Sequence, residues 1–357
     1  MNIAFLLPNF SGHVVGSTLV YYRFAQELAA RGHHIDVFHP CLEEGRGSFR
    51  MRMRALAWSA KMSLLGKPVS WFDFPKGVHP KFRPDLDGLD LDHDVVVAFG
   101  WRMLEVLDRI RIRGKVIGYV VEYETWAEAE PDRKARMENA YRRRVPLLCC
   151  SRAVESMLIQ VGARDVRLCV LGVDLERYRV LTPPERRFPG RVGFPVRMEP
   201  VKSPEILEGA LRLLRGRFGS AVSLWGFGHA AVPSGILDLL DEYHVHPDNG
   251  TLADLYDRSA IFAVPSRKEG FGMPAAEAMS SGCAVVSTDN GGIGTFGIDG
   301  ENCVLVPVES PERLAEAVAQ LVEDPVRRIG IANRAPDSVR FLRWTEAGDR
   351  LARQLEV

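Results

Sequence analysis

The chain has 357 residues, enough for two domains of ordinary size, and its hydrophobic fraction of 46% is that of a globular protein. Its 46 basic and 46 acidic side chains cancel, which argues against a protein that binds nucleic acid over its whole surface. The N-terminal apolar run is too short for a signal peptide, and no run of about 20 apolar residues follows, so we expect a cytoplasmic protein. The six cysteines form no CxxC pair, have no histidines at zinc spacing, and are expected to be free thiols.

Short apolar runs alternate with helical patterns along the first half of the chain. Ile3 to Leu7 predicts a first strand, and the helix that follows it ends at Gly32. Later strands are expected at Ile35 to Phe38, Val95 to Phe99, Val116 to Val121, Leu147 to Cys150 and Val166 to Leu171. Strands that alternate with helices indicate a parallel, doubly wound sheet. Residues 1–175 are therefore predicted to form a Rossmann-like domain.

The alternation stops and then restarts near the middle of the chain. Residues 176–191 are rich in Pro and Arg, lack a period and are predicted to be a linker. Beyond it, strands are expected at Val192 to Phe194, Ala221 to Trp225, Ile261 to Val264, Ala284 to Ser287 and Val304 to Val306. Residues 192–336 then form a second Rossmann-like domain, and residues 337–357 a terminal amphipathic helix. The fold class is α/β, with a cleft expected between the two domains.

The stretch SRKEGFGMPAAEAMSSG, residues 266–282, lies where a predicted strand ends and a helix begins. Gly270 and Gly272 let the backbone approach a ligand closely, and the N–H groups around Phe271 and the helix start favour an anion such as phosphate. Glu277, expected in the first helical turn, can accept hydrogen bonds from a ribose diol. Glu269 can accept from sugar hydroxyls or face a developing positive charge.

Two cations follow an earlier strand in the sequence RMEPVK. Arg197 and Lys202 could clamp a diphosphate, the first as a fork and the second as a point charge, and neutralise it as it leaves. Taken singly, each feature has a plainer interpretation: Glu277 as a glutamate near a helix dipole, and the two cations as solvated surface charges. The ordered series of RxxxxK, WGFG, EGFGMPxxE and TDNGG, each at the end of a strand, favours a nucleotide-sugar site.

This series resembles the retaining GT-B glycosyltransferases often called family 4, or glycosyltransferases group 1. The resemblance covers the whole chain and is strongest from residue 192 to 325, where the E-x7-E spacing lies within PSRKEGFGMPAAEAMSSG. It implies a hexosyltransferase-like enzyme (EC 2.4) that transfers a sugar from a nucleotide-diphosphate sugar, with retention, to a glycan, a lipid-linked sugar or a small molecule. Arg197 and Lys202 then resemble the diphosphate clamp, Glu269 the residue beside the donor sugar, and Glu277 the ribose-binding glutamate.

The resemblance also bears on the donor and on alternative functions. It implies no bound metal and no cofactor beyond the donor, for which a UDP-sugar is the default and GDP- or dTDP-sugars stay open. A nucleotide-sugar epimerase would lack the EGFGxPxxEAM setting that this chain carries. A nucleotide-sugar-binding protein without catalysis remains a further alternative, which a turnover assay separates from an enzyme.

The chain departs from the family pattern in three places. The first strand–helix loop has Val15 and Gly16 where the family often has two glycines, so Gly16 is the expected donor contact there. The run VIGYVVEYETW has no histidine near the expected reaction centre, and we expect Glu122 or Glu124 to face the cleft, with rim charges as the alternative. The loop after TDNGG continues as IGTF rather than to an acidic residue, which would affect sugar selectivity.

Residues 46–67 form a basic segment of the acceptor-side domain. They hold four Arg, two Lys and no acid, together with Trp58 and several Leu and Met. Such a segment can lie on an anionic membrane, so peripheral contact with the inner face of the membrane is a hypothesis. A helical wheel of the segment gives no single apolar face, and the alternative is a solvated helix or one that lines the acceptor cleft. No nucleic-acid partner is expected.

Overall fold

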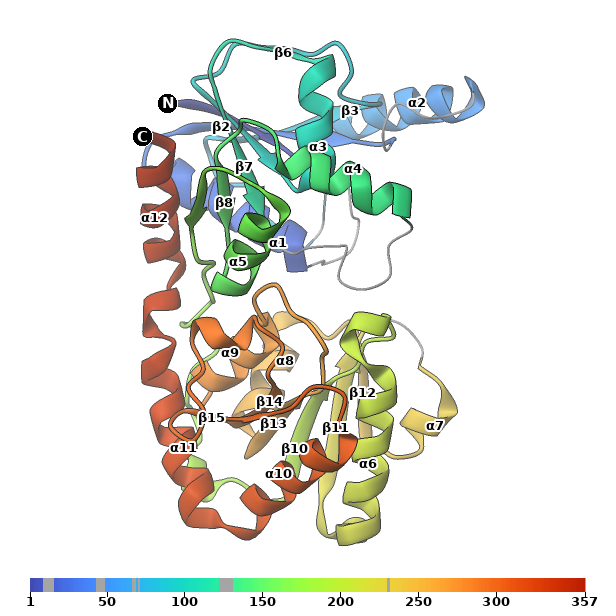
Figure 1. Ribbon diagram of the computed structural model, residues 1–357, viewed down its shortest axis with the longest axis vertical. Coiled ribbons are helices and arrows are strands. Elements are labelled where there is room, and N and C mark those ends of the chain that lie inside the picture. The colour runs from blue at the N-terminus through green and yellow to red at the C-terminus, as the bar shows by residue number, and fades with distance from the viewer. Residues whose placement is uncertain are drawn as a thin grey trace. The chain divides into compact units, whose positions relative to one another are not determined.

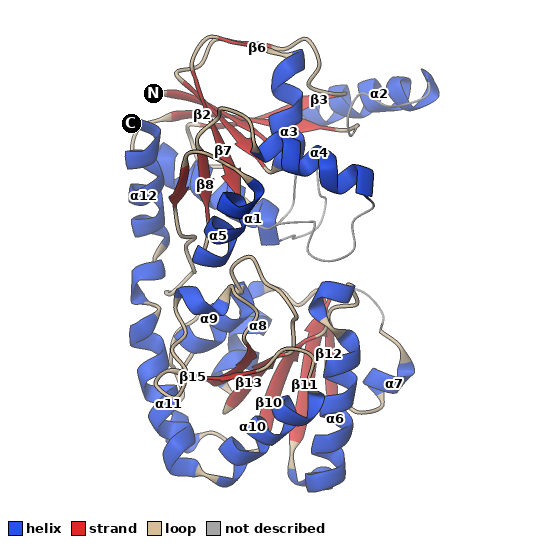
Figure 2. Cartoon of the chain, in the orientation of Figure 1, coloured by secondary structure: helices blue, strands red, loops and turns tan. Residues whose placement is uncertain are grey.

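The computed structural model describes residues 1–8, 16–42, 49–65, 69, 71–121, 131–229 and 232–356. The chain divides into two compact units (Figure 1). The first unit consists of Met1–Gly172 with Trp344–Val357, and the second of Val173–Arg343. In each unit, parallel strands lie between helices (Figure 2).

The first unit is built around a parallel sheet. Among its described residues, seven strands pair in the order β3-β2-β1-β5-β7-β8-β9. These strands are β1 (Asn2–Leu6), β2 (His34–Pro40), β3 (Val78–Arg83), β5 (Val95–Phe99), β7 (Lys115–Val120), β8 (Leu147–Cys149) and β9 (Val166–Leu168), and the short β4 (Asp90–Leu91) pairs with β6 (Arg111–Ile112). The helices are α1 (Gly16–Ala30), α2 (Phe49–Leu65), α3 (Trp101–Val106), η1 (Leu107–Arg109), α4 (Pro131–Tyr141), α5 (Arg152–Val161) and α12 (Trp344–Glu356).

The last helix, α12, packs on α1 although more than 300 residues separate them in the sequence. Gly348 permits the close approach, because a Cβ atom there would lie 2.6 Å from Glu27 Cβ. Arg31, the residue after α1, holds the contact, since its Nε donates to Asp349 Oδ1 at 2.8 Å. Trp344 fills the space above Gly172, where a Cβ atom would lie 2.4 Å from the indole.

The second unit has a parallel sheet of its own. Six strands of its described part pair in the order β12-β11-β10-β13-β14-β15. They are β10 (Arg191–Pro195), β11 (Ser223–Gly228), β12 (Glu242–Val245), β13 (Ile261–Val264), β14 (Ala284–Thr288) and β15 (Cys303–Val306). The α-helices are α6 (Pro204–Phe218), α7 (Ser234–Leu237), α8 (Asn249–Asp257), α9 (Met273–Ser280), α10 (Pro311–Glu323) and α11 (Pro325–Ser338). Short 3-10 turns are η2 (Pro184–Arg186), η3 (Pro200–Lys202), η4 (Gly219–Ala221), η5 (Ile293–Thr295) and η6 (Arg340–Leu342).

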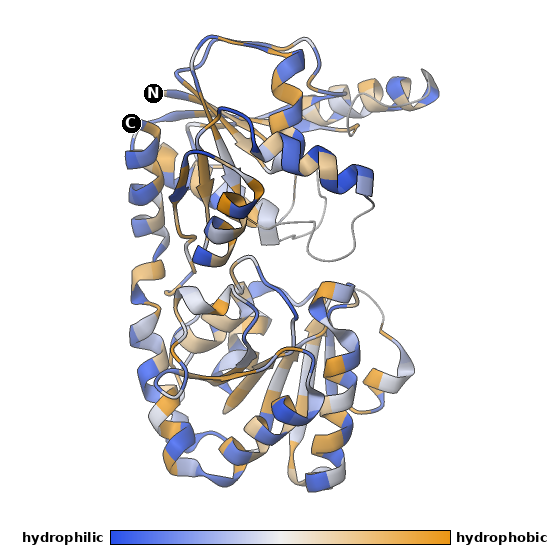
Figure 3. Cartoon of the chain, in the orientation of Figure 1, coloured by the Kyte–Doolittle hydropathy of each residue, from blue (hydrophilic) through white to orange (hydrophobic). Residues whose placement is uncertain are grey.

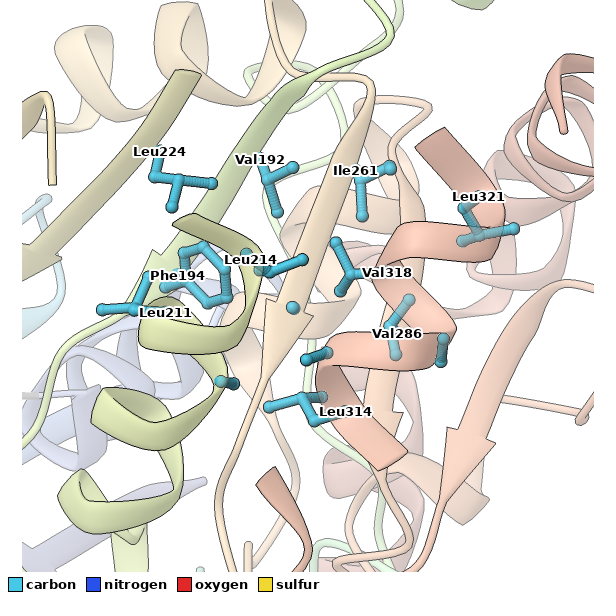
Figure 4. Packing of buried hydrophobic residues seen from close by; sticks show 14 of the residues in the cluster. Val192, Phe194, Leu211, Leu214, Leu224, Ile261, Val286, Leu314, Val318 and Leu321 are labelled. Carbon is cyan, nitrogen blue, oxygen red and sulfur yellow. The ribbon is translucent and has the colours of Figure 1, made fainter. Parts of the chain in front are cut away.

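The core of the second unit lies between one face of its sheet and the helices α6 and α10. Aliphatic side chains of β10, β11, β13 and β14 meet those of the two helices (Figure 4). Val192, Ile261 and Leu314 are fully buried there. Because both faces of a parallel sheet are covered, its strands are continuous apolar runs, which is why the sequence marks them clearly. The predicted α/β class with two Rossmann-like domains is confirmed.

Two expected boundaries differ from the observed ones. The segment 176–191 belongs to the second unit, because the buried Arg187 guanidinium donates to the carbonyl oxygens of Thr182, Ser259 and Ser281. The region after residue 337 is not one helix. Helix α11 ends at Ser338, two residues after Pro336, the turn η6 follows, and α12 begins only at Trp344. Within the described residues, no helix is long and apolar enough to cross a membrane.

Candidate active site

The strand order of the second unit reverses between β10 and β13. From β10 the chain proceeds to β11 and β12 on one side, and then returns to β13 on the other side of β10. Such a reversal leaves an opening at the carboxyl ends of the two central strands, where open α/β sheets bind their ligands. Arg197 and Lys202 follow β10, and Glu269 and Glu277 follow β13. The four predicted charged residues thus lie at one edge of one sheet.

The loop from β13 into α9 presents backbone N–H groups. Gly272 precedes the helix with φ 90° and ψ 49°, a left-handed conformation that residues other than glycine rarely adopt. The N–H groups of Ala275 and Ala276 donate to the Gly272 carbonyl. Those of Phe271, Gly272 and Met273 donate to no backbone oxygen of the described residues. Consecutive N–H groups without a backbone partner at a helix start can bind an anion, and the anion site here stays a prediction.

Glu269 and Lys202 form an ion pair between the segments that follow β13 and β10. Lys202 Nζ lies 2.8 Å from Glu269 Oε2, and both side chains are mostly buried. The second carboxylate oxygen, Oε1, accepts a hydrogen bond from Ser266 Oγ at 2.7 Å. Lys202 is held by the turn η3, which ends at Ser203 with φ 54° and ψ 60°. The N–H groups of Arg267 and Lys268 donate to the Val201 carbonyl of this turn at 2.9 and 3.2 Å. The loop that carries Lys202 and the loop that carries Glu269 are therefore fixed to each other.

Arg197 has a different environment from Lys202. Among the described residues its guanidinium has no hydrogen bond or ion pair of its own. Burial lowers its pKa, while the carboxylates of Glu199 and Glu269 act in the opposite direction. The guanidinium has thus lost part of its hydration without a contacting carboxylate in return. An anionic ligand would stabilise it, because the ligand replaces the lost hydration.

Glu277 is buried within the second unit. Its side chain is 9% exposed, and Oε2 accepts a hydrogen bond from the Tyr256 hydroxyl on α8 at 3.2 Å. Burial raises its pKa from 4.5 to about 8, and the nearby Asp174 adds to the rise, while Arg177 and Arg197 oppose it. Helix α9 begins at Met273, so Glu277 lies in its second turn rather than in the first turn, where it was expected. A buried carboxyl group that accepts one hydrogen bond from Tyr256 has lone pairs left for the hydroxyl groups of a ligand.

The TDNGG loop after β14 closes one side of the site. A Cβ atom at Gly292 would lie 2.7 Å from the Phe271 carbonyl carbon and 2.9 Å from Glu269 Cβ, so only glycine fits. Asn290 ties the two loops together, because its carbonyl oxygen accepts from Glu269 N at 3.0 Å and its Oδ1 from Ile293 N at 3.2 Å. The backbone that carries Glu269 is thus supported from both neighbouring strands.

The structure brings together the predicted residues of the second unit and adds some that the sequence did not single out. Tyr256, Ser266 and Asn290 contact the predicted residues directly. Ser266 could have been found from its place three residues before Glu269, whereas Tyr256 comes from another helix and carries no local signal. Gly16 begins α1 in the first unit. Glu122 and Glu124 lie outside the described residues.

Comparisons with known proteins agree with this architecture. Residues 189–324 match the family model described as Glycosyl transferases group 1. D-inositol 3-phosphate glycosyltransferase from Nocardiopsis dassonvillei is 29% identical over an alignment of 254 residues, and the match covers 63% of this chain and 58% of that protein. The chain spans about half the length of the curated relatives it matches.

Solved structures show the same fold over nearly the whole chain. Sucrose-phosphate synthase from Thermosynechococcus elongatus has a TM-score of 0.73 at 17% identity, and 99% of each chain is covered. Anabaena HepE in complex with UDP and glucose has a TM-score of 0.71 at 17% identity, with 100% of this chain and 99% of that chain covered. At such identity the likeness establishes the fold alone, and it confirms the GT-B class.

Proposed function

Since residues 189–324 carry the domain of the group 1 glycosyltransferases, we propose that this chain transfers a sugar from a nucleotide-diphosphate sugar to an acceptor. One observation carries the proposal: the Lys202–Glu269 pair, the Arg197 guanidinium, the open N–H groups before α9 and the buried Glu277 all lie at the carboxyl ends of β10 and β13. A diphosphate, a ribose and a sugar need this set of cations, N–H donors and carboxylate acceptors.

Each residue has a role in the proposed reaction. Arg197 and Lys202 neutralise the diphosphate as the bond to the sugar breaks and negative charge grows on the leaving oxygen. The N–H groups of Phe271 and Gly272 support the same phosphates. Glu277 accepts hydrogen bonds from the ribose hydroxyls, and Glu269 accepts from the hydroxyls of the donor sugar. Retention of the anomeric configuration, and turnover without a bound metal or cofactor, are parts of the proposal.

The donor and acceptor classes follow from the chemistry and from the relatives. Anabaena HepE is seen with UDP and with UDP-glucose, which supports a UDP-sugar as the donor. The curated relatives are named for D-inositol 3-phosphate, which supports a hydroxyl-rich acceptor and makes a phosphorylated polyol one candidate beside a glycan or a lipid-linked sugar. We place the reaction in the cytoplasm, with peripheral contact to the inner face of the membrane.

Calorimetric titration with UDP-, GDP- and dTDP-sugars, without added metal, tests the donor site, and hydrolysis or transfer of the bound sugar tests turnover. We expect one base to bind, Glu277→Ala to weaken that binding, and Lys202→Ala to lower turnover more than binding. Glu316→Ala and Arg212→Ala are matched controls, because both residues pair on exposed helix surfaces of the same unit. Unchanged affinity and turnover in both site variants would refute the assignment.

A further inference from the structure

Helix α2, the basic helix that follows β2, attaches to the first unit by one narrow face. Ala55 and Ser59 are buried, and Trp58 is half-buried with its indole against the Phe82 ring of β3, at a centroid distance of 5.5 Å. Met62 is half-buried as well. At about 100° per residue, these four positions fall within about 100° of the helix circumference. The packing of α2 against β3 therefore uses one side of the helix.

The opposite side of α2 is an exposed apolar stripe. It is formed by Met53, Leu56, Ala57, Ala60 and Leu64, which share an arc of about 100° centred roughly opposite the buried face. Leu64 is 88% exposed, and Met53 and Leu56 are each 49% exposed. The stripe explains why a helical wheel of the whole segment shows no single apolar face: there are two, and one of them is buried.

Exposed apolar side chains are concentrated on this helix. Among the described residues of the first unit, seven large hydrophobic side chains are exposed; five of them belong to α2, and Met53, Leu56 and Leu64 of these lie on the stripe. The seven are Met1, Met51, Met53, Leu56, Leu64, Leu65 and Ile159. Because isolated exposed apolar residues are normal and clusters are not, the concentration points to an interaction surface.

Cations border the stripe on both sides. Arg50, Arg54 and Lys61 follow it on one side of the helix and Arg52 on the other, and none of the residues Phe49–Leu65 is acidic. Figure 3 shows the hydrophilic and hydrophobic residues interleaved along α2. A second copy of this face would bring like charges together, which disfavours a dimer through it. A flat, negatively charged surface over an apolar interior would accommodate both the apolar stripe and the cations that border it.

We propose that the outward face of α2 binds the anionic surface of a lipid bilayer. The helix lies in the plane of the interface, with Met53, Leu56 and Leu64 among the acyl chains and the flanking cations at the lipid phosphates, as amphipathic interfacial helices do. The inference deepens the proposed function. It rests on that function only for one consequence, which is that the acceptor is a membrane lipid or is linked to one. The proposal gives a function to the face of α2 that does not pack against β3.

Sedimentation of the full chain with vesicles tests the inference. We expect binding to equimolar phosphatidylcholine–phosphatidylglycerol vesicles at low salt, little binding to phosphatidylcholine alone, and release at high salt, because about 1 M salt shortens the Debye length to about 3 Å. The combined variant Arg50→Gln, Arg54→Gln and Lys61→Gln should weaken binding by about a hundredfold, at about fivefold per cation. Met53→Ser combined with Leu64→Ser should weaken binding to the same vesicles without changing the net charge.

Matched controls separate the face of α2 from general stickiness. Ile159→Ser removes an apolar side chain of the same unit that is 58% exposed, and a charge-matched control replaces three exposed arginines by Gln, at Arg111, Arg113 and Arg164. Both controls should sediment as the unaltered protein does. Absence of vesicle binding, equal loss in the controls, or a dimer that the Met53 and Leu64 changes dissociate would overturn the inference.

Nucleotide-sugar titration of the same preparation keeps the two proposals apart. A protein that binds the donor but not the vesicles loses the membrane inference and the proposed peripheral contact, and keeps the proposed sugar transfer. A protein that binds the vesicles but no nucleotide sugar loses only the proposed function.

Discussion

Donor binding should depend on pH through Glu277. The free protein holds this carboxyl group with a pKa of about 8, because burial and the nearby Asp174 disfavour its charged form. Only about a tenth of the molecules are then ionised near pH 7. If the ribose hydroxyls donate to a carboxylate, binding must first remove the proton. Donor affinity should therefore rise about tenfold between roughly pH 7 and pH 9, and nearly one proton should be released per donor bound near pH 7.

Calorimetry in two buffers of different ionisation enthalpy counts the released protons. The titrant should be the nucleotide sugar, because the terminal phosphate of a nucleoside diphosphate itself titrates near pH 6. Glu277→Gln keeps an oxygen for the Tyr256 hydroxyl and removes the titration, so its affinity should be weaker at high pH and nearly independent of pH. Proton release near zero, with an affinity that does not change with pH, would refute the assignment of Glu277 to the ribose.

The raised pKa of Glu277 also predicts how the free energy of unfolding depends on pH. A carboxyl whose pKa is higher in the folded chain binds more protons there than in the unfolded chain between about pH 4.5 and 8. The free energy of unfolding should therefore fall as the pH rises through this window, by on the order of 5 kcal/mol from this group alone, at about 1.4 kcal/mol per pKa unit. Glu277→Gln should stabilise the ligand-free protein at high pH while it weakens donor binding. A merely structural glutamate would show the stability change without the loss of binding.

Three further substitutions test the supports of the site. Lys202→Met should lower turnover by about a hundredfold or more with a smaller effect on donor affinity, because its charge is needed most as the diphosphate leaves. Arg212→Met on the exposed surface of α6 is the control, and equal losses of turnover in the two variants would contradict the role of Lys202. Gly292→Ala should destabilise the second unit by about 1–3 kcal/mol in thermal unfolding and weaken donor binding, whereas Gly294→Ala, whose Cβ would meet nothing within 4 Å, should do neither. Arg187→Met should lower the free energy of unfolding by about 3–5 kcal/mol, because it leaves Asp257 and four carbonyl groups without their buried donor. The exposed Arg186→Met should cost little, and a small effect at Arg187 would show that the segment before β10 is not anchored as described.

The sequence predicted the elements of the candidate site because each charged residue follows a strand that reads as an apolar run. Arg197 comes after β10 and Glu269 after β13, and a parallel sheet gathers such residues at one edge. What local pattern cannot supply is which strands are neighbours. The adjacency of β10 and β13 is a contact between distant segments, and it decides that Lys202 meets Glu269.

Other features depend on the same kind of long-range packing. Residues 176–191 have the composition of a linker, yet Arg187 is buried against carbonyl groups that lie far along the chain. The raised pKa of Glu277 comes from its burial in the folded unit, which outweighs the opposite effect of the hydrogen bond from Tyr256 on another helix. The two apolar faces of α2 could not be separated on a wheel until β3, which the sequence did not predict as a strand, showed which of them is covered.

The charges of the ligand-free site indicate the order in which it meets a donor. Lys202 is held by Glu269, and burial keeps Glu277 mostly protonated near neutral pH, so Arg197 is the one of the four predicted charges that is neither paired nor neutralised within the described residues. An arriving diphosphate therefore gains first from Arg197 and the open N–H groups before α9. The Lys202 ammonium has three N–H donors and gives one to Glu269 Oε2, so it can also donate to a phosphate, while Ser266 holds Glu269 Oε1. In the proposed reaction, Lys202 thus links the diphosphate to the carboxylate that faces the donor sugar.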